Sequence, residues 1–226
     1  KEDVLRYVLC ATAPETKDND FTWKDFQTRN NSELVAILGN FVNRAVVLTH
    51  KFFDGKVPAI DSLQDIDKET IEALKQFPEQ IAGSIEKFRF REALGLVMDL
   101  ARLGNKYLAE TEPWKLIKTD EKQTATILNI ALQIAANLSI VAEPFLPRTS
   151  EKLKDLLKID TYSWDDAGSY QLLKVGSKIS QATLLYCKIE DEDIEKQIDK
   201  LKKPEIVSIN VSPQKGEVNF DDFMKM

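Results

Sequence analysis

Histidine and cysteine are nearly absent from this 226-residue sequence, which has a single histidine, His50, and two cysteines, Cys10 and Cys187. The two cysteines lie far apart and form no CxxC pair, so we expect free thiols, the usual state in a cytoplasmic protein. A zinc site, a Ser-His-Asp triad or histidine-based acid–base chemistry would each need more of these side chains than the sequence supplies. We therefore expect neither catalysis nor a metal site within this chain, and we expect His50 to lie on the surface without a role.

Long apolar runs and a leader sequence are also missing. No uninterrupted apolar stretch approaches the ~18 residues that a membrane span requires, so we expect no membrane partner. The sequence starts at Lys1 rather than at a methionine, and its first residues have helical rather than signal-peptide character. We expect it to be a piece of a longer chain.

Positive charge is in deficit. Lys and Arg number 31 against 37 Asp and Glu, a net charge of −6, within an ordinary globular composition of 43% hydrophobic and 30% charged residues. Nucleic-acid binding usually rests on basic side chains that neutralise phosphates, so this balance is unfavourable for an RNA-binding protein. Any RNA contact should therefore be a small surface on an acidic body, with further phosphate contacts elsewhere in the parent protein.

Glycine is scarce as well, at eight residues, and apolar residues recur at helical spacing through most of the chain. This pattern predicts an all-α fold, an antiparallel helical bundle with a C-terminal arm. Gly95 and Gly104 would permit close packing of one of the helices. Helices are expected over residues 1–11, 31–53, 68–85, 88–109, 121–142, 147–158 and 191–202.

The helix expected over residues 31–53 carries a polar pair beside its apolar face. At about 100° per residue, Asn40 and Arg44 lie at the side of this face and one turn apart. Such a pair is most often solvated, but it can also present an amide and a guanidinium to a ligand. The apolar face itself repeats every three or four positions, at Leu34, Leu38, Phe41, Ala45, Leu48 and Phe52.

The tripeptide Glu112-Pro113-Trp114 follows the helix expected over residues 88–109. Proline disfavours the helical conformation at the preceding residue, so the helix should end near Thr111, with the indole just past its end. A tryptophan after a proline often fills a core. An indole next to Asn40 and Arg44 would instead combine a flat stacking surface with hydrogen-bonding groups, the means by which proteins read an unstacked RNA base.

Six parts of the sequence, taken in order, form a recognisable set. They are Asp3-Val4-Leu5-Arg6-Tyr7-Val8-Leu9, Asp20-Phe21-Thr22-Trp23-Lys24-Asp25-Phe26, Asn31-Ser32-Glu33-Leu34, Leu38-Gly39-Asn40-Phe41-Val42-Asn43-Arg44, Asn105-Lys106-Tyr107 with Pro113-Trp114, and Lys188-Ile189-Glu190 with Ile194-Glu195-Lys196-Gln197-Ile198. Each part is short, but together they span most of the chain. The set resembles the anticodon-binding region of class I methionyl-tRNA synthetases.

The resemblance implies a binding partner and a set of site residues. In such synthetases this bundle inspects the methionine anticodon, CAU, of methionine-accepting tRNA. The base-contacting asparagine and arginine correspond to Asn40 and Arg44, and the stacking tryptophan corresponds to Trp114. A splayed cytosine would stack on the indole and offer its N3 and O2 acceptors to Arg44 and to the Asn40 amide.

The same resemblance divides the chain and places the rest of the enzyme outside it. Neither an H-I-G-H-type signature nor a K-M-S-K-S loop occurs, so attachment of methionine to tRNA with ATP would belong to a catalytic domain of the same parent chain. Whether that domain holds zinc, and whether a downstream module forms a homodimer, stays open. The expected division is residues 1–30 as the end of the connecting region, 31–158 as the anticodon-binding bundle, 159–204 as a C-terminal arm and helix, and 205–226 as a linker to a downstream tRNA-binding module.

Two other interpretations stay open. Leucyl-, valyl-, isoleucyl- and cysteinyl-tRNA synthetases carry related helical bundles, and an N-x-x-x-R pattern alone does not separate them from the methionine enzymes. Pro113-Trp114 and Leu38-Gly39-Asn40 favour methionine. A helical protein-interaction scaffold without an RNA role would account for the acidic composition and for the missing catalytic groups.

Overall fold

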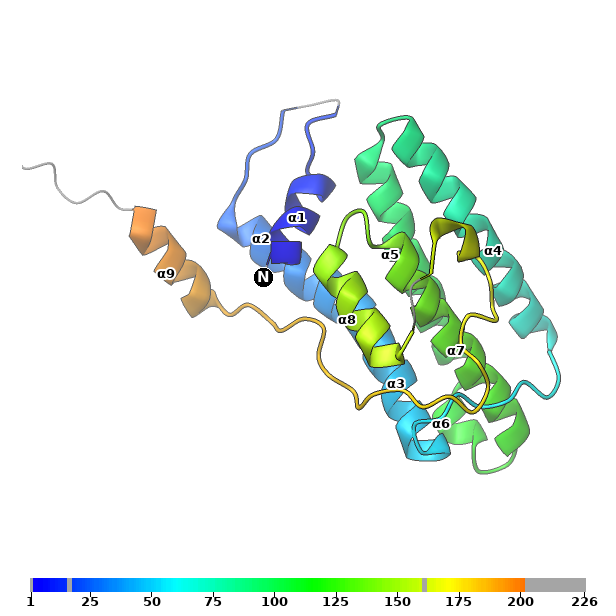
Figure 1. The fold of residues 1–226 in the computed structure, drawn as a ribbon. Helices are drawn as coiled ribbons and strands as arrows, with labels where there is room; N and C mark the ends of the chain where they lie inside the picture. The colour runs from blue at the N-terminus through cyan, green and yellow to red at the C-terminus, as the bar shows by residue number, and fades with distance from the viewer. Residues whose placement is uncertain (1, 16–17, 160–161, 202–226) are drawn as a thin grey trace, which may run out of the picture.

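Helices provide nearly all the regular structure of the computed structural model (Figure 1), which describes residues 2–15, 18–159 and 162–201. Within these ranges there is no strand, only an isolated antiparallel bridge between Lys56 and Lys178. The predicted all-α fold is confirmed, whereas the linker predicted for residues 205–226 lies outside the described residues. The elements in chain order are α1 (Glu2–Ala11), α2 (Trp23–Arg29), η1 (Asn30–Gly39), α3 (Asn40–Phe53), α4 (Asp65–Glu86), α5 (Phe90–Thr111), α6 (Pro113–Leu116), α7 (Glu121–Val141), α8 (Pro147–Leu157), η2 (Trp164–Asp166) and α9 (Asp191–Leu201).

Helix α7 occupies the centre of the bundle, in contact with α3, α4, α5, α6 and α8. Nearly every residue from Gln123 to Val141 is buried. By length and mean hydropathy, α7 (1.6) and the continuous helix Trp23–Phe53 (1.2) would both suit a membrane span, but 94% of the most apolar stretch of α7 is buried inside the protein. α7 is therefore the core helix, and α4 and α5 lie side by side as a long pair against it (Figure 1).

Three polar side chains interrupt the apolar surface of α7 at intervals of four residues and so share one face: Asn129, Gln133 and Asn137. Each is buried and bonded to the backbone of another segment. Gln133 donates to the Leu173 carbonyl oxygen and accepts from the Leu173 N–H, both at 2.9 Å, and Asn137 makes an equivalent pair of bonds with residues 168–169. The arm that follows α8 is therefore fastened to the core helix through its backbone.

The helix predicted over residues 31–53 begins earlier, at Trp23, and runs without a break to Phe53 as α2, η1 and α3. Thr22 caps its start, because its hydroxyl accepts from the Asp25 N–H at 3.1 Å. The prediction missed this start because the first turns contain polar residues with tertiary roles. Gln27, for example, donates to the Ile189 carbonyl oxygen at 3.1 Å and is buried against the arm.

The middle of this continuous helix, η1, is a π-helix. At its end, the Asn40 N–H bonds to the carbonyl oxygens of Ile37 and of Val35, the latter five residues back. Segments of this kind are frequent at functional sites, and here the segment ends where the polar pair Asn40 and Arg44 begins. Of the predicted apolar face, four residues are fully buried and two are half-buried against the core: Leu34, Leu38, Phe41 and Ala45, then Leu48 and Phe52.

The prediction that His50 lies on the surface without a role is wrong. His50 is half-buried, and its Nε2 donates to the Ser180 carbonyl oxygen at 2.8 Å. Its ring also packs against Gly55, where an added Cβ atom would lie 2.3 Å from the imidazole and where φ is left-handed at 67°. The histidine therefore has a structural role, because it holds the arm against the end of α3.

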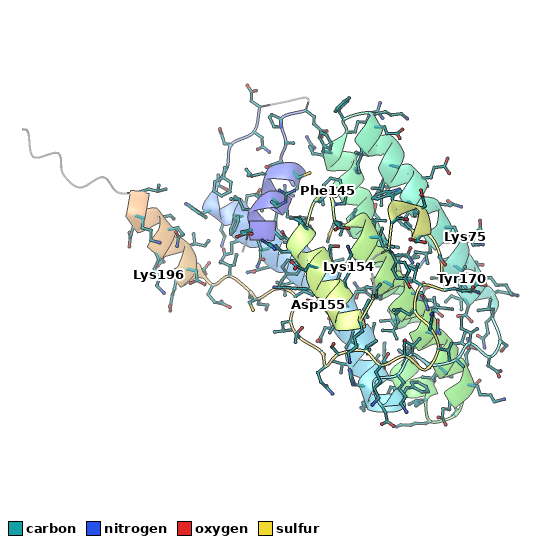
Figure 2. All side chains as sticks on the ribbon, viewed as in Figure 1. Lys75, Phe145, Lys154, Asp155, Tyr170 and Lys196 are labelled. Atoms are coloured by element: carbon teal, nitrogen blue, oxygen red, sulfur yellow. The ribbon has the colours of Figure 1, made fainter. Side chains whose placement is uncertain are left out.

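The remaining helices end close to where the sequence places them. The ranges predicted for α5, α7, α8 and α9 differ from the structure by two residues or fewer. Helix α9 extends beyond the bundle, where Lys196 marks its position (Figure 2). Its first residue, Asp191, accepts from Gln27 of α2 at 2.9 Å, so the C-terminal helix is anchored next to the start of the Trp23–Phe53 helix.

Candidate nucleic-acid interface

Asn40 and Arg44 lie one above the other at the start of α3. Asn40 is the first residue of α3 and Arg44 follows four positions later, the spacing that places two side chains on one face of a helix. Asn40 is exposed and Arg44 is half-buried. Within the described ranges no salt bridge involves Arg44, so its positive charge is not neutralised by a neighbouring carboxylate.

Trp114 is held by a sharp turn after α5. Helix α5 ends at Thr111, as predicted, and Glu112 adopts a left-handed conformation with φ of 42°. Pro113 then opens α6 at the first helical position, where its fixed φ and its missing N–H are tolerated. Pro113 is buried and Trp114 is half-buried. The proline thus anchors the turn while the indole keeps an accessible part.

The two remote segments meet. The guanidinium carbon of Arg44 lies 4.9 Å from the centroid of the Trp114 ring, a cation–π arrangement. An indole, a guanidinium and an amide therefore share one side of α3. The indole is neither fully buried nor on the far side of the bundle from Asn40 and Arg44.

Asn105 of α5, for which no role was predicted, joins this group. Its Nδ2 donates to the carbonyl oxygens of Ile37 (2.8 Å) and Ala101 (3.2 Å), and its Oδ1 accepts from the Nδ2 of Asn40 (3.1 Å). The pairing links helices that are far apart in sequence. The only signal that could have indicated it was the position of Asn105 within the Asn105-Lys106-Tyr107 segment of the family resemblance.

A close approach of two helices brings Asn105 within reach of Asn40. Gly104 precedes Asn105, and a Cβ atom at Gly104 would lie 2.3 Å from the ring of Phe41, the fully buried residue that follows Asn40. Helices α3 and α5 therefore pack at a separation that requires glycine at this position, as predicted. The same prediction for Gly95 is wrong, because no atom of a neighbouring helix lies within 4 Å of where its Cβ atom would be.

Basic side chains near the candidate site are paired with carboxylates on their own elements. Lys106 lies 3.8 Å from Glu110, and Lys115 lies 2.7 Å from Glu112, all with well-exposed side chains. Exposed pairs of this kind contribute only about 0–1 kcal/mol each. Little positive charge is therefore available at this surface to contact phosphates, as we expected from the acidic composition.

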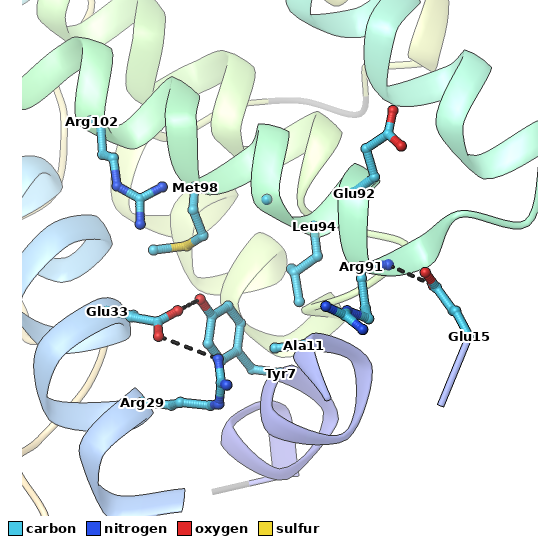
Figure 3. Close-up of a pocket in the computed structure, with 11 residues that line it drawn as sticks. Tyr7, Ala11, Glu15, Arg29, Glu33, Arg91, Glu92, Leu94, Met98 and Arg102 are labelled. Carbon is cyan, nitrogen blue, oxygen red and sulfur yellow. Dashed lines mark hydrogen bonds and ion pairs between the residues drawn. The ribbon is translucent and has the colours of Figure 1, made fainter. Parts of the chain in front are cut away.

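A separate cavity of about 470 Å³ lies between α1, η1 and α5 (Figure 3). Its lining contains three arginines and three glutamates, so the charges balance. Tyr7 donates to the Glu33 carboxylate, and burial together with this hydrogen bond raises the pKa of the Tyr7 hydroxyl. Arg29 lies 3.4 Å from Glu33 and 2.8 Å from Asp25. This network ties α1 to the Trp23–Phe53 helix, and none of the predicted site residues lines the cavity.

Metal-ligating side chains are not gathered anywhere in the part of the chain that the structure describes. No group of three His, Cys, Asp or Glu residues there lies close enough together to hold a metal ion. The indole, guanidinium and amide of the candidate site offer stacking, charge and hydrogen bonding.

Two family models match the chain. Residues 57–204 match the model described as the anticodon binding domain of methionyl tRNA ligase, and residues 1–46 match the model described as tRNA synthetases class I (M). These ranges do not coincide with the predicted division into residues 1–30, 31–158 and 159–204, which stays a prediction.

Curated relatives and solved structures agree with these matches. The chain is 58% identical over 230 residues to the methionine–tRNA ligase of Cytophaga hutchinsonii, covering 100% of this chain and 33% of that protein. It is 56% identical over 230 residues to the corresponding protein of Phocaeicola vulgatus, covering 100% of this chain and 34% of that protein. The apo structure of Mycobacterium tuberculosis methionyl-tRNA synthetase has the same fold, with a TM-score of 0.75 at 22% identity over 83% of this chain and 39% of that one. The chain thus spans about a third of the length of its curated relatives.

Proposed function

The chain belongs to the methionine–tRNA ligase family, and on this premise we propose that it recognises the CAU anticodon of methionine-accepting tRNA through Asn40, Arg44 and Trp114. The complete enzyme would attach methionine to that tRNA, with ATP, in the cytoplasm. ATP, and any zinc, would be bound by a catalytic domain outside this chain. Assignment to a leucine, valine, isoleucine or cysteine enzyme is set aside by the family matches.

The observation that supports this function most directly is the contact between Arg44 and Trp114 at 4.9 Å. A cation–π contact at an accessible site stabilises by only about 0.5–1 kcal/mol. Stacking of a base on an aromatic side chain contributes about 1–3 kcal/mol. A base can therefore replace Arg44 over the indole, and the guanidinium, once displaced, stays close enough to bond to that base.

A guanidinium has only donors, so it suits the acceptor atoms of a splayed base. Cytosine presents two adjacent acceptors, N3 and O2, on its Watson–Crick edge. Arg44 would donate to these atoms while the base stacks on Trp114. The pre-existing contact keeps the indole ordered before RNA arrives, which reduces the conformational entropy that Trp114 loses on binding.

The test is RNA binding by the full-length protein with Trp114→Ala and Arg44→Ala. Loss of the stacking surface should weaken binding of a CAU anticodon stem-loop by about 5- to 150-fold, the equivalent of 1–3 kcal/mol. Trp164→Ala and Arg89→Ala are the matched controls. Trp164 is likewise half-buried but lies in η2, and Arg89 precedes α5, whose length of about 33 Å separates it from Trp114. Both controls should bind the stem-loop as the unmodified protein does.

Unchanged affinity in folded Trp114→Ala and Arg44→Ala variants would contradict the proposed site. If, in addition, no tRNA bound under any salt condition and a protein bound specifically instead, the interaction-scaffold interpretation would replace the RNA one. Circular dichroism and thermal unfolding of each variant separate a lost contact from a lost fold.

A further inference from the structure

The orientation of the Asn105 amide is fixed by its surroundings. Its Nδ2 lies within hydrogen-bond distance of two backbone carbonyl oxygens, those of Ile37 (2.8 Å) and Ala101 (3.2 Å). Carbonyl oxygens only accept, so the NH₂ group of Asn105 must face them. Its Oδ1 must then face the other way, toward Asn40.

This fixed carbonyl in turn determines the orientation of Asn40. The atom of Asn40 that faces Asn105 Oδ1, at 3.1 Å, must be a donor, its Nδ2. A rotation of the Asn40 amide by 180° would place two acceptor oxygens against each other. The Oδ1 of Asn40 therefore faces away from Asn105 and accepts no hydrogen bond from the residues that the structure describes, and Asn40 is exposed at the start of α3.

From this geometry, and resting on the proposed function, we infer that Asn105 is a positioning residue that makes Asn40 an acceptor toward the RNA. Asn40 Oδ1 accepts from the exocyclic amino group of a base. This differs from the prediction from the sequence, in which the Asn40 amide donates to N3 or O2. Cytosine and adenine carry such an amino group, at N4 and N6, and uracil carries an oxygen at the same place. The site thus selects against uracil, because O4 would meet an acceptor.

Two side chains would share the Watson–Crick edge of the base. The Watson–Crick edge of cytosine presents one donor, N4, next to two acceptors, N3 and O2. Asn40 supplies the acceptor for N4, and Arg44 supplies donors for N3 and O2. Cytosine differs from uracil in the group at position 4 and at N3, and neither side chain alone senses both differences. Asn40 and Arg44, held one turn apart on α3, together match the donor and two acceptors of cytosine.

The experiment removes single amino groups from the RNA. Affinities of the full-length protein are measured for a CAU stem-loop, for one with cytosine replaced by pyrimidin-2-one ribonucleoside, and for one with adenine replaced by purine ribonucleoside. Each replacement deletes only the exocyclic amino group. Deletion of the cytosine amino group should weaken binding to the unmodified protein by about tenfold, and the adenine deletion is the comparison.

The protein variants identify the residues that sense the deletion. In Asn105→Ala the natural stem-loop should bind more weakly, and deletion of the amino group should then cost little more, because Asn40 is free to rotate. In Asn40→Ala, an exposed change that leaves the anchoring of Asn105 intact, the penalty for the deletion should also vanish. Lys106→Ala, one position from Asn105 and exposed, is the control and should keep the full penalty.

An unmodified protein that is indifferent to deletion of the cytosine amino group would overturn the inference, and so would an Asn105→Ala protein that keeps the full penalty. If Asn105→Ala fails to fold, Asn40→Ala still decides, because retention of the penalty there excludes Asn40 as the acceptor. These outcomes concern only the role of Asn105 and Asn40. The proposed function itself would be contradicted by a different result, in which Trp114→Ala and Arg44→Ala leave binding of the natural stem-loop unchanged.

Discussion

The thiol of Cys10 shows how its surroundings alter the chemistry of one residue. Burial raises the pKa of this thiol to about 11, the charge of Glu15 adds to the shift, and that of Arg6 opposes it. Because the thiolate is the reactive form, we expect maleimide to label Cys10 slowly at pH 7 in a Cys187→Ser variant. The rate should rise roughly tenfold per pH unit until the pH nears that pKa.

The comparison for this prediction is Cys187, which is exposed. In a Cys10→Ser variant, Cys187 should react faster at pH 7 than Cys10 does in the Cys187→Ser variant. Equal rates at neutral pH would show that Cys10 is accessible as a thiolate and would contradict the protecting effect of burial.

Single residues were predictable where one helix or one turn determines their position. Helical spacing placed Asn40 and Arg44 one turn apart, and the proline placed Trp114 just past the end of α5. Their grouping as one site came from the family resemblance. The bond between Asn40 and Asn105 could not be predicted in this way, because it depends on how closely α3 and α5 pack.

Helix packing at Gly104 gives a prediction for a pair of elements. Gly104→Ala would place a Cβ atom 2.3 Å from the buried ring of Phe41, so α3 and α5 must move apart or Phe41 must leave its position. Overpacking of this kind costs about 1–3 kcal/mol. Chemical denaturation should show that loss, together with weaker binding of the CAU stem-loop, because the bond from Asn40 to Asn105 lengthens.

Gly95→Ala on the same helix is the matched control. No atom of a neighbouring helix lies within 4 Å of the position that its Cβ atom would take, and its φ is not left-handed. Alanine there should stabilise the protein by about 0.4–1 kcal/mol, since it reduces the conformational freedom of the unfolded chain. Destabilisation of both variants to the same extent would argue against a specific contact at Gly104.

Helix ends set by local signals were predicted well, and helix features set by tertiary contacts were not. Pro113 indicated the end of α5, and Pro147, which suits the first turn of a helix, indicated the start of α8. The early start at Trp23 and the π-helical segment η1 were not predicted. Buried polar residues such as Gln27 bond to the arm there and interrupt the apolar periodicity that indicates a helix.

The charge of the whole chain leads to a prediction about salt. With a net charge of −6 and few unpaired basic groups at the site, the chain alone should contact only one or two phosphates. The logarithm of its affinity for a CAU stem-loop should then fall with the logarithm of salt concentration with a slope of about −0.7 to −1.4. A titration from low to moderate KCl measures this slope, and a value steeper than about −3 would contradict a small recognition surface.

The three amides on α7 have a consequence for how much chain this fold requires. Gln133 and Asn137 are deep in an apolar interior, and the groups that satisfy them belong to residues 168–173, far downstream. A protein shortened ahead of that stretch would lose these hydrogen bonds to α7, each worth about 0.5–1.5 kcal/mol. The smallest autonomous folding unit must therefore extend through Leu173. The arm that follows α8, although it is irregular, belongs to the hydrophobic interior.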